Sequence, residues 1–364
     1  MSATRGRPAL LASLWYSPAP AWRLARLLLS PLSLLYWLAL YLRNTAWDSG
    51  LLRVRSVGLP VLCVGNINSG GTGKTPLVIW LVDSLKKRGY TAAVVSRGYG
   101  ASGDVDRVDA ARSGAGSHRS ADEAVLVARR CDCTVVTGAD RLAACRLAER
   151  EAGVDLLILD DGFQHRRLAR DLDLVLLAVG DRDARLLPRG PLREPASALR
   201  RADIIVENAG GESGPMVSRR AVGLVDRVSS DAEPGSLERL RGQRVVVICG
   251  IAAPAAFVDM LGSCAALVEE VYAFADHHDY QPGDLGPLRA AQRSGALLMT
   301  TEKDLVKLEA FVDDGFSPLA LRLGLEVEGG PGLLDAVVDA LDLKARGPHH
   351  QRSGAPRGDA GINK

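Results

Sequence analysis

Residues 68–75 have the types and spacing that hold a nucleotide phosphate. They read NSGGTGKT and depart from the phosphate-binding pattern G-x-x-x-x-G-K-[ST] only at the first position. The glycines let backbone N–H groups approach an anion, the lysine reaches its oxygens, and the threonine ligates Mg²⁺. Asparagine tolerates a positive φ well, so we expect Asn68 to disturb the loop least. A turn without a ligand is the alternative. The expected phosphate-binding residues are Asn68, Ser69, Gly70, Gly71, Thr72, Gly73, Lys74 and Thr75.

A second set of chemically competent residues is the stretch VDLLILDDGFQHRR, residues 154–167. Its apolar run ends in Asp160 and Asp161, the pattern of a Walker B strand whose carboxylate helps to hold Mg²⁺. Both carboxylates would lie at the sheet edge where ligands bind in such folds. A solvated strand end is the alternative. Glu194, in LLPRGPLREP, is a further carboxylate in a loop after a strand.

Asp122 lies in the stretch SADEAVLVARR, residues 120–130. Ser120 and Glu123 form an S-x-x-E capping box, and Asp122 falls in the first helical turn, where a carboxylate complements the helix dipole. Capping explains Glu123 fully and Asp122 in part. The residue pattern alone therefore does not make Asp122 catalytic.

The elements that position these residues alternate between strand and helix. The apolar run at 60–65 predicts a buried parallel strand, and residues 76–89 have helical apolar spacing with a basic, glycine-terminated end. Further strands are predicted at 91–96, 133–138, 154–160, 172–179 and 202–207. This order predicts an α/β fold, a P-loop NTPase-like, doubly wound and mostly parallel sheet. The long Gly/Ser/Asp loop at 98–120 is expected to be functional or disordered.

Length and composition set the outer bounds. A chain of 364 residues is long for one core, and a second α/β block begins around residue 244. The domains expected are a membrane-associated segment at 1–50, a P-loop core at 51–215, a smaller α/β domain at 216–343 and a disordered tail at 344–364. A net charge of +2 argues against a nucleic-acid partner. The six cysteines form no C-x-x-C pair, which favours reduced thiols in the cytosol over a zinc site.

The segment at 22–44 is almost wholly apolar and carries arginines at both ends. Its uninterrupted part, Leu27 to Leu42, is shorter than the roughly 20 residues that span a bilayer, and Pro31 should kink it. We expect the segment to lie in the membrane interface, with Arg23, Arg26 and Arg43 near anionic headgroups. A true span and a buried core helix are the alternatives. Either membrane placement puts the rest of the chain in the cytoplasm.

Six motifs in order give the chain a family resemblance. They are VGNINSGGTGKTP, SRGYG, DDGFQH, LLPRGPLREP, FADHHDY and TEKD. Together they resemble the tetraacyldisaccharide 4′-kinase family of lipid A biosynthesis, over residues from about 14 to 340. The pairing of DDGFQH with an altered P-loop is specific to that family, in which the first P-loop position is often not glycine. Members also carry an N-terminal membrane-associated helix.

The resemblance implies a reaction and a set of residue roles. The enzyme would transfer the γ-phosphate of ATP, with Mg²⁺, to the 4′-hydroxyl of an acylated glucosamine disaccharide 1-phosphate. It implies catalytic roles for Asp122 as general base, His277 as its assistant and Asp161 at the reaction centre, and metal-binding roles for Thr75, Asp160 and Glu194. Two departures matter: the family's GDEP is ADEA here, and the double histidine leaves His277 or His278 open, with the order D-H favouring His277.

The implied substrate is anchored in a bilayer by its acyl chains, so the enzyme must come to the membrane. The location implied is the cytoplasmic face of the bacterial inner membrane, peripheral or monotopic. Arg166, Arg167 and Arg170 could bind the substrate's 1-phosphate through bidentate contacts. A solvated arginine run is the alternative.

Two other classes of function compete with a kinase. Partitioning ATPases and metallochaperones share a related P-loop, but their signature lysine is replaced here by Ser69. A membrane-anchored binding module without turnover would leave the acid–base residues unexplained. The TEKD motif, Thr301 to Asp304, has no assigned role: it could lie near the nucleotide base, close a cleft or form a surface charge cluster.

Overall fold

The computed structural model describes residues 10–98, 105–108, 122–151, 153–208 and 215–343. Most of the loop at 98–120, the capping residue Ser120 and the tail at 344–364 therefore lie outside the described residues. The expectations of a capping box, of a functional or disordered loop and of a disordered tail stay predictions.

The described chain forms one 12-stranded sheet, with the order β10-β9-β11-β12-β8-β7-β6-β1-β5-β2-β4-β3. The strands are β1 (Val61–Gly65), β2 (Ala92–Ser96), β3 (Asp106–Arg107), β4 (Val135–Thr137), β5 (Leu156–Asp160), β6 (Leu172–Leu177), β7 (Ile204–Asn208), β8 (Met216–Val225), β9 (Arg244–Cys249), β10 (Leu267–Ala273), β11 (Leu297–Thr301) and β12 (Leu319–Val327). All neighbours pair in parallel except β8 with β12 and β3 with β4. The mostly parallel sheet and its predicted strands are confirmed.

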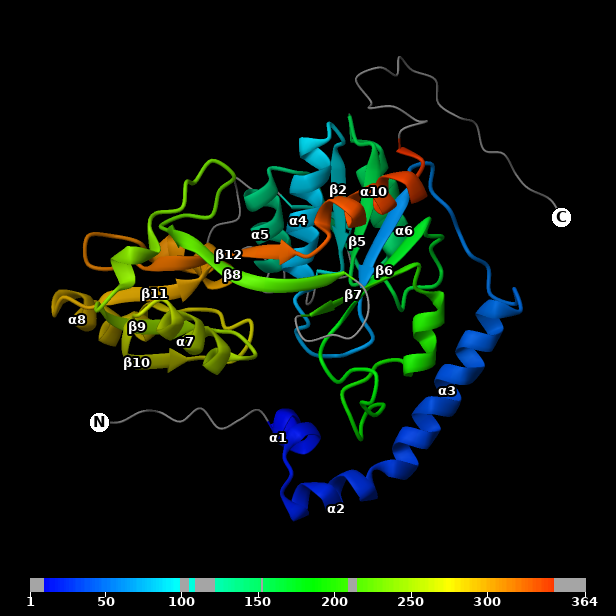
Figure 1. Cartoon of the computed structure of the whole chain (residues 1–364), viewed down its shortest axis with the longest axis horizontal. Helices are drawn as coiled ribbons and strands as arrows, with labels where there is room; N and C mark the ends of the chain where they lie inside the picture. Colours follow the sequence, from blue (N-terminus) through cyan, green and yellow to red (C-terminus); the bar gives the residue numbers. More distant parts are fainter. Residues whose placement is uncertain (1–9, 99–104, 109–121, 152, 209–214, 344–364) are drawn as a thin grey trace.

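The helices cover both faces of the sheet, as Figure 1 shows. They are α1 (Leu10–Tyr16), α2 (Pro20–Leu28), α3 (Ser30–Asp48), α4 (Lys74–Lys87), α5 (Asp122–Cys131), α6 (Arg141–Glu149), α7 (Pro254–Ser263), α8 (Gly286–Arg293), α9 (Glu302–Leu308) and α10 (Gly330–Ala340). Short 3₁₀ turns are η1 (Ala196–Arg201), η2 (Leu237–Leu240), η3 (Pro282–Leu285) and η4 (Glu309–Phe311).

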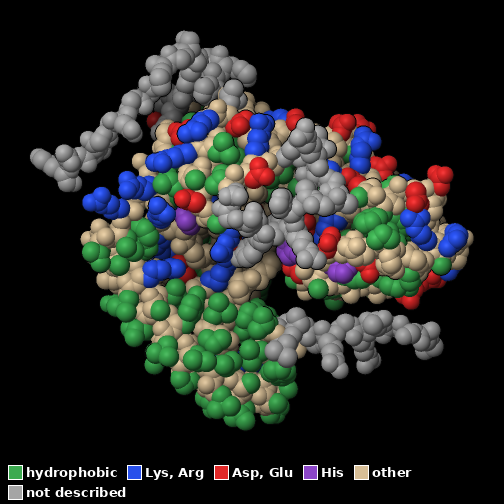
Figure 2. Space-filling view, turned by 180° about the vertical axis from the view of Figure 1, so that it is seen from behind, with side chains coloured by type: hydrophobic (Ala, Val, Ile, Leu, Met, Phe, Trp, Pro, Cys, Tyr) green, Lys and Arg blue, Asp and Glu red, His purple; other side chains and the backbone are tan. Residues whose placement is uncertain are grey.

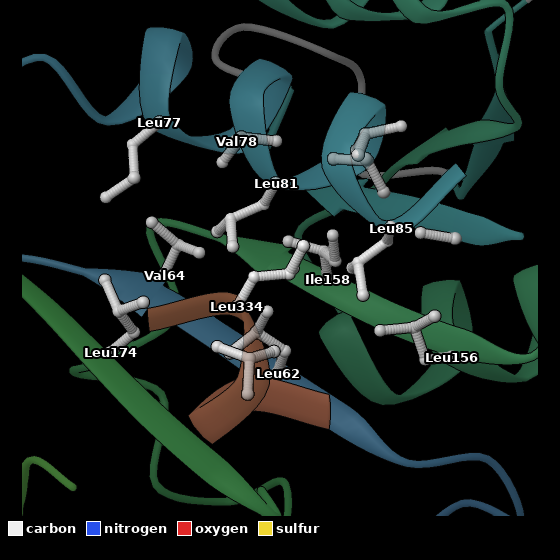
Figure 3. Close-up of a cluster of buried hydrophobic side chains, with 14 of the residues drawn as sticks. Leu62, Val64, Leu77, Val78, Leu81, Leu85, Leu156, Ile158, Leu174 and Leu334 are labelled. Carbon is white, nitrogen blue, oxygen red and sulfur yellow. The ribbon is translucent and has the colours of Figure 1, made fainter. Parts of the chain in front are cut away.

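The core beneath the P-loop is built on one face of α4. Leu77, Leu81 and Leu85 recur at helical spacing and are fully buried against β1 and β5 (Figure 3). The last described helix, α10, completes the same core through Leu334. The chain thus returns to its first half after forming the strands of the second. The division into domains at residue 216 stays a prediction, since β8 and β12 carry one sheet across it.

Helices α2 and α3 form the N-terminal arm, which extends away from the sheet (Figure 1). No single described helix is long and apolar enough to cross a membrane, but α2 and α3 meet that requirement as a pair bent by 46°. Pro31 lies in the first turn of α3, next to this bend, which confirms the expected kink. Leu40 alone is buried within α3, so the core-helix alternative is wrong.

The N-terminal arm contacts the loop that carries the motif LLPRGPLREP. Ser33 Oγ donates to Leu186 O (3.3 Å), and Tyr36 Oη donates to Arg193 O (2.8 Å). Trp15 of α1 donates through Nε1 to Pro188 O (3.1 Å). The same loop contacts the P-loop, because Ser69 N donates to Pro191 O (2.9 Å). One short segment therefore lies between the arm and the phosphate-binding loop.

Candidate functional site

The site is a cavity of about 1,260 Å³ between the two halves of the sheet. The P-loop enters it directly from the end of β1, and α4 begins at Lys74 after Gly73, whose φ of 96° only glycine adopts without strain. Asp160 and Asp161 at the end of β5 line the same cavity. So does His277, which comes from the second half of the chain.

The side-chain hydrogen bonds of Asn68, rather than its backbone conformation, account for asparagine at the first P-loop position. It is not among the described residues with positive φ, so the expected reason for its presence is wrong. Its amide Nδ2 donates to Asp181 Oδ1 (2.5 Å), and its Oδ1 accepts from Gly70 N (2.8 Å). Asparagine can make both bonds because its amide donates and accepts. These two bonds fix the conformation of the loop, which a glycine at this position could not do because it has no side chain.

Asp161 is shared by two cations. Lys74 Nζ lies 3.3 Å from Oδ1, and the Arg193 guanidinium bonds both carboxylate oxygens (2.9 and 3.0 Å). Burial raises the pKa of Asp161, but Lys74 and Arg193 outweigh it and lower the pKa to about 2. The residue also has a φ of 59°, a conformation that non-glycine residues adopt rarely and mostly at functional positions. Asp161 therefore holds the P-loop lysine in place.

Asp160 is in the opposite electrostatic state. It is almost fully buried, and among the described residues it makes no ion pair within salt-bridge distance. Burial, with the charge of Glu123 adding to it, raises the pKa of Asp160 to about 7 despite the opposing charge of Lys74. A buried carboxylate without a cation suits Mg²⁺, which binds oxygen ligands and needs only one or two carboxylates besides the phosphates. Thr75 lines the same cavity and supplies a second oxygen.

Other metals fit the described residues poorly. No group of three or more His, Cys, Asp or Glu side chains in the described ranges could hold a metal ion. A dedicated protein cage is therefore not formed by those residues, whereas the Asp160 and Thr75 pair fits an ion that arrives with the nucleotide.

Asp122 and His277 come together from opposite halves of the chain. His277 Nδ1 lies 3.4 Å from Asp122 Oδ2, and Lys307 Nζ lies 2.8 Å from the same oxygen. Burial raises the pKa of Asp122, but hydrogen bonds from His277 and Lys307 outweigh it and lower the pKa. His278 instead contacts Asp284 (3.0 Å). Of the two histidines, the structure brings His277 to Asp122.

Glu194 is not brought to the other expected metal ligands. It is fully buried, and its two oxygens bond the arginines Arg43 (2.7 Å) and Arg201. Arg43 belongs to α3, so Glu194 joins the N-terminal arm to the core. Its role as a metal ligand stays a prediction, and its two arginine partners compete with that role.

The arginine run after DDGFQH is only partly available to a ligand. Arg166 bonds Asp48 (2.5 Å), and Arg170 bonds Asp173 (3.1 Å). Arg167 is exposed. A 1-phosphate site built on all three side chains would have to break two ion pairs.

Three residues at the site were not expected from sequence. Arg193 lies in the motif LLPRGPLREP beside Glu194, and it bonds Asp161 and Asn66 (2.7 Å). Lys303 and Lys307 come from α9, one helical turn apart. Their spacing in the sequence was a signal that the two side chains share a helix face. The sequence did not show which residues the two lysines would contact.

Comparison with known proteins shows the family of the chain. The family described as Tetraacyldisaccharide-1-P 4'-kinase matches residues 25–341. A tetraacyldisaccharide 4'-kinase of Aeromonas hydrophila is 38% identical over 342 residues, covering 93% of this chain and 98% of that protein. One of Syntrophus aciditrophicus is 42% identical over 335 residues, covering 81% and 88%. A crystal structure of LpxK from Aquifex aeolicus in complex with ATP has a TM-score of 0.72 and 30% identity, covering 87% of this chain and 99% of that one.

A phosphate-binding loop that shares one cavity with a histidine in contact with a buried carboxylate is the arrangement expected of a P-loop phosphotransferase. Within that class, the match over residues 25–341 identifies the family, and the chain belongs to the tetraacyldisaccharide 4′-kinases. The resemblance seen in the sequence is confirmed. The fold class is confirmed too, since the similar solved structure covers most of the chain.

Nucleotide binding should depend on pH through Asp160. Its folded pKa of about 7 exceeds the unfolded 3.8, so between these values the folded protein keeps a proton that the unfolded chain releases. Without nucleotide, the free energy of unfolding therefore falls as pH rises through this window. If Asp160 is a magnesium ligand, its ionised form is the one that binds magnesium–nucleotide, so the affinity for magnesium–nucleotide should rise over the same window and a proton should be released on binding.

Calorimetry in two buffers of different ionisation enthalpy measures that proton. With a non-hydrolysable ATP analogue and Mg²⁺ near pH 7, wild type should release more protons per binding event than Asp160→Asn, because the analogue's own ionisation is common to both. Equal proton release in the two proteins would contradict the assignment.

Glu194→Ala should lower the free energy of unfolding by about 3–5 kcal/mol, because it leaves the Arg201 guanidinium without its buried partner. Urea denaturation measures the loss. As a control, Asp313→Ala breaks the more exposed pair with Arg289 and should lower the free energy of unfolding far less. A variant of unchanged stability that needs more Mg²⁺ for activity would instead support the role of Glu194 as a metal ligand.

Proposed function

We propose that the chain transfers the γ-phosphate of ATP to the 4′-hydroxyl of a tetraacyldisaccharide 1-phosphate. The observation that carries this proposal is a cavity lined by the P-loop and by His277, whose ring contacts the buried carboxylate of Asp122. The family match supports the same reaction. ATP is the phosphoryl donor, and the ATP-bound relative supports that choice.

The P-loop side of the cavity binds the triphosphate. Backbone N–H groups of residues 69–75 surround the phosphates, and Lys74 exchanges Asp161 for the β and γ oxygens when the nucleotide enters. Thr75 and Asp160 hold Mg²⁺, which offsets the charge on these oxygens when it is bound. Arg193 keeps Asp161 fixed as Lys74 moves, because its two bonds do not involve the lysine.

The opposite side of the cavity prepares the acceptor. Asp122 accepts the proton of the 4′-hydroxyl, and His277 keeps the carboxylate oriented. The lowered pKa of Asp122 keeps it ionised at neutral pH and makes it a weak base. A weak base suffices because phosphoryl transfer passes through a loose transition state in which the hydroxyl has lost little of its proton.

The N-terminal arm provides the contact with the membrane. Its exposed apolar side chains include Leu27 (63% exposed), Leu28 (70%) and Leu34 (64%), and Figure 2 shows the resulting continuous apolar surface. An apolar surface of this kind on a soluble domain marks an interaction site, and a substrate with acyl chains is confined to a bilayer. We place the protein at the cytoplasmic face of the bacterial inner membrane, with the arm in the interface.

The 1-phosphate of the acceptor is proposed to meet the arginine run near the arm. Arg167 is the exposed member, while Arg166 joins the end of α3 to the core through Asp48. We therefore assign the contact first to Arg167. Arg166 and Arg170 remain available only if the bound phosphate displaces their carboxylate partners.

The alternative, a partitioning or metallochaperone ATPase, is not favoured. Ser69 replaces the signature lysine, and its hydroxyl donates to Pro191 O (2.9 Å) within the same subunit. The family match also covers the second half of the chain, which contributes His277 to the site.

Asp122→Asn tests the proposed base. If Asp122 accepts the hydroxyl proton, kcat should fall by about 10²–10⁴-fold with little change in the KM for ATP. His277→Ala should then give a loss that is not additive with Asp122→Asn, since the paired groups act as a unit. The assay is ATP consumption that depends on added tetraacyldisaccharide 1-phosphate.

If Asp122 only complements the helix dipole, the same substitution should cost about 0.3–1 kcal/mol of stability and almost nothing in kcat. ATP hydrolysis that is independent of the lipid would favour the ATPase alternative.

A triple variant of the arm, Leu27→Ser, Leu28→Ser and Leu34→Ser, tests membrane contact. Each exposed leucine contributes about 1.5–3 kcal/mol when fully buried in an apolar phase, so the variant should no longer sediment with anionic phospholipid vesicles. The matched control is Val179→Ser with Leu267→Ser, two exposed apolar residues outside the arm, which should sediment as wild type does. Undiminished sedimentation of the triple variant would mean that another surface attaches the protein.

A further inference from the structure

The TEKD motif starts helix α9, and each of its residues has a partner. Thr301 caps the helix by accepting from Asp304 N (3.1 Å). Asp304 is fully buried and accepts from Gly250 N (3.1 Å) and Tyr280 Oη (3.0 Å). These bonds fix the start of α9 against the end of β9. The motif is therefore a rigid platform rather than a surface charge cluster.

Lys303, the third residue of the motif, reaches His277. Its Nζ lies 3.2 Å from His277 Nε2 and 2.8 Å from Asp276 Oδ1. The lysine side chain is only 14% exposed. Lys303 thus contacts Nε2 of the His277 ring, whereas Asp122 Oδ2 contacts the other ring nitrogen, Nδ1.

Lys307, one turn further along α9, reaches Asp122. Its Nζ lies 2.8 Å from Asp122 Oδ2 and donates to His278 O (2.9 Å). The second bond fixes the backbone next to His277, which has a φ of 61° and is held in a strained conformation. One lysine thus contacts both the carboxylate and the segment that presents the histidine.

The donor chemistry of the two lysines determines the state of the pair between them. An ammonium group has three donors and no acceptor, so His277 Nε2 must accept from Lys303. A neutral imidazole then carries its proton on Nδ1, and that proton points to Asp122 Oδ2. Asp122 Oδ2 is contacted by both His277 Nδ1 and Lys307 Nζ.

We propose that Lys303 and Lys307 are positioning residues that hold His277 in its Nδ1–H tautomer and Asp122 in the orientation that receives the 4′-hydroxyl. This inference deepens the proposed function and rests on the proposed roles of Asp122 and His277. Neither lysine touches the reacting atoms. Lys303 acts through the histidine ring, and Lys307 acts through the carboxylate.

Neighbouring ion pairs keep the helix α5, which carries Asp122, against α9. Glu302 accepts from Arg130 of α5 (2.7 Å) and from Arg322 of β12 (3.0 Å), and Arg129 pairs with Glu309. These pairs are mostly buried and therefore poorly screened by salt. They hold α9 where Lys307 reaches Asp122 and Lys303 reaches His277. The charged groups that face the Asp122–His277 pair in the described chain are Glu123, Asp276, Lys303, Asp304 and Lys307.

Nitrogen NMR of histidine-labelled protein tests the tautomer directly. The full-length protein is labelled with ¹⁵N in its histidine rings, and the His277 signals are identified by their loss in His277→Gln. Wild type should show a protonated Nδ1 and an unprotonated, hydrogen-bonded Nε2. Lys303→Met removes the ammonium while keeping a similar length, and the ring should move toward the Nε2–H form that free histidine prefers.

Kinetics test the positioning role. Lys303→Met and Lys307→Met should each lower kcat by about 10- to 100-fold, the range for a misplaced catalytic group, with the KM for ATP little changed. Lys307→Arg, which retains the cation, should recover part of the loss. The matched control is Lys86→Met, which removes an exposed lysine paired with Asp132 and should keep wild-type kcat and wild-type histidine signals.

The two levels of the inference fail separately. A wild-type His277 that carries its proton on Nε2, or on both nitrogens, at the pH of maximal activity overturns the tautomer assignment. Unchanged kcat in both folded lysine variants overturns the positioning role. Wild-type kcat in Asp122→Asn overturns the proposed base instead, and the NMR result would still describe the pair correctly.

Discussion

The position of β1 between β5 and β6 is the constraint on which the site depends. Parallel strands end at one edge, so the pairing of β1 with β5 puts the P-loop and the two aspartates side by side, where Lys74 pairs with Asp161. The buried face of α4 keeps this edge in register, because its leucines pack on both strands. The loop that follows β6 then reaches back to the P-loop and adds Arg193. The geometry of the phosphate site is thus a result of strand pairing and core packing.

Carboxylates that look alike in the sequence have different pKa values in the folded protein, because their neighbours differ. Asp160 and Asp161 are adjacent, yet burial without a cation raises one pKa to about 7 and two cations lower the other to about 2. Asp161 serves as the counter-ion of Lys74 and Arg193, and Asp160 has the state that our proposed metal ligand requires. Asp122 resembles Asp161 in having cationic neighbours, which explains why an unusually basic carboxylate is not found at the acceptor side. In the proposed mechanism, Asp122 would therefore act as a base through its orientation rather than through a raised pKa.

Much of the fold could be predicted because local patterns determine it. The apolar runs marked the first-half strands, and the P-loop and DDGFQH motifs marked the nucleotide side. The prediction for Asn68 was wrong because it considered φ alone, whereas the residue is selected by bonds to Asp181, more than a hundred positions away. The lysines of α9 were missed for a related reason. Their partners, Asp122 and His277, come from other elements, and no spacing along the chain shows such a meeting.

The return of α10 to the first core has a consequence for how the protein is made. The core under the P-loop includes Leu333, Leu334 and Val337, which the ribosome adds only after the strands of the second half. Part of the apolar face of α4 therefore stays uncovered between the synthesis of α4 and that of α10, an interval in which more than half of the chain is made. Elongation proceeds at about 5–20 residues per second, so this interval lasts roughly tens of seconds. Until α10 emerges, the nascent chain exposes leucines of α4 that the finished protein buries.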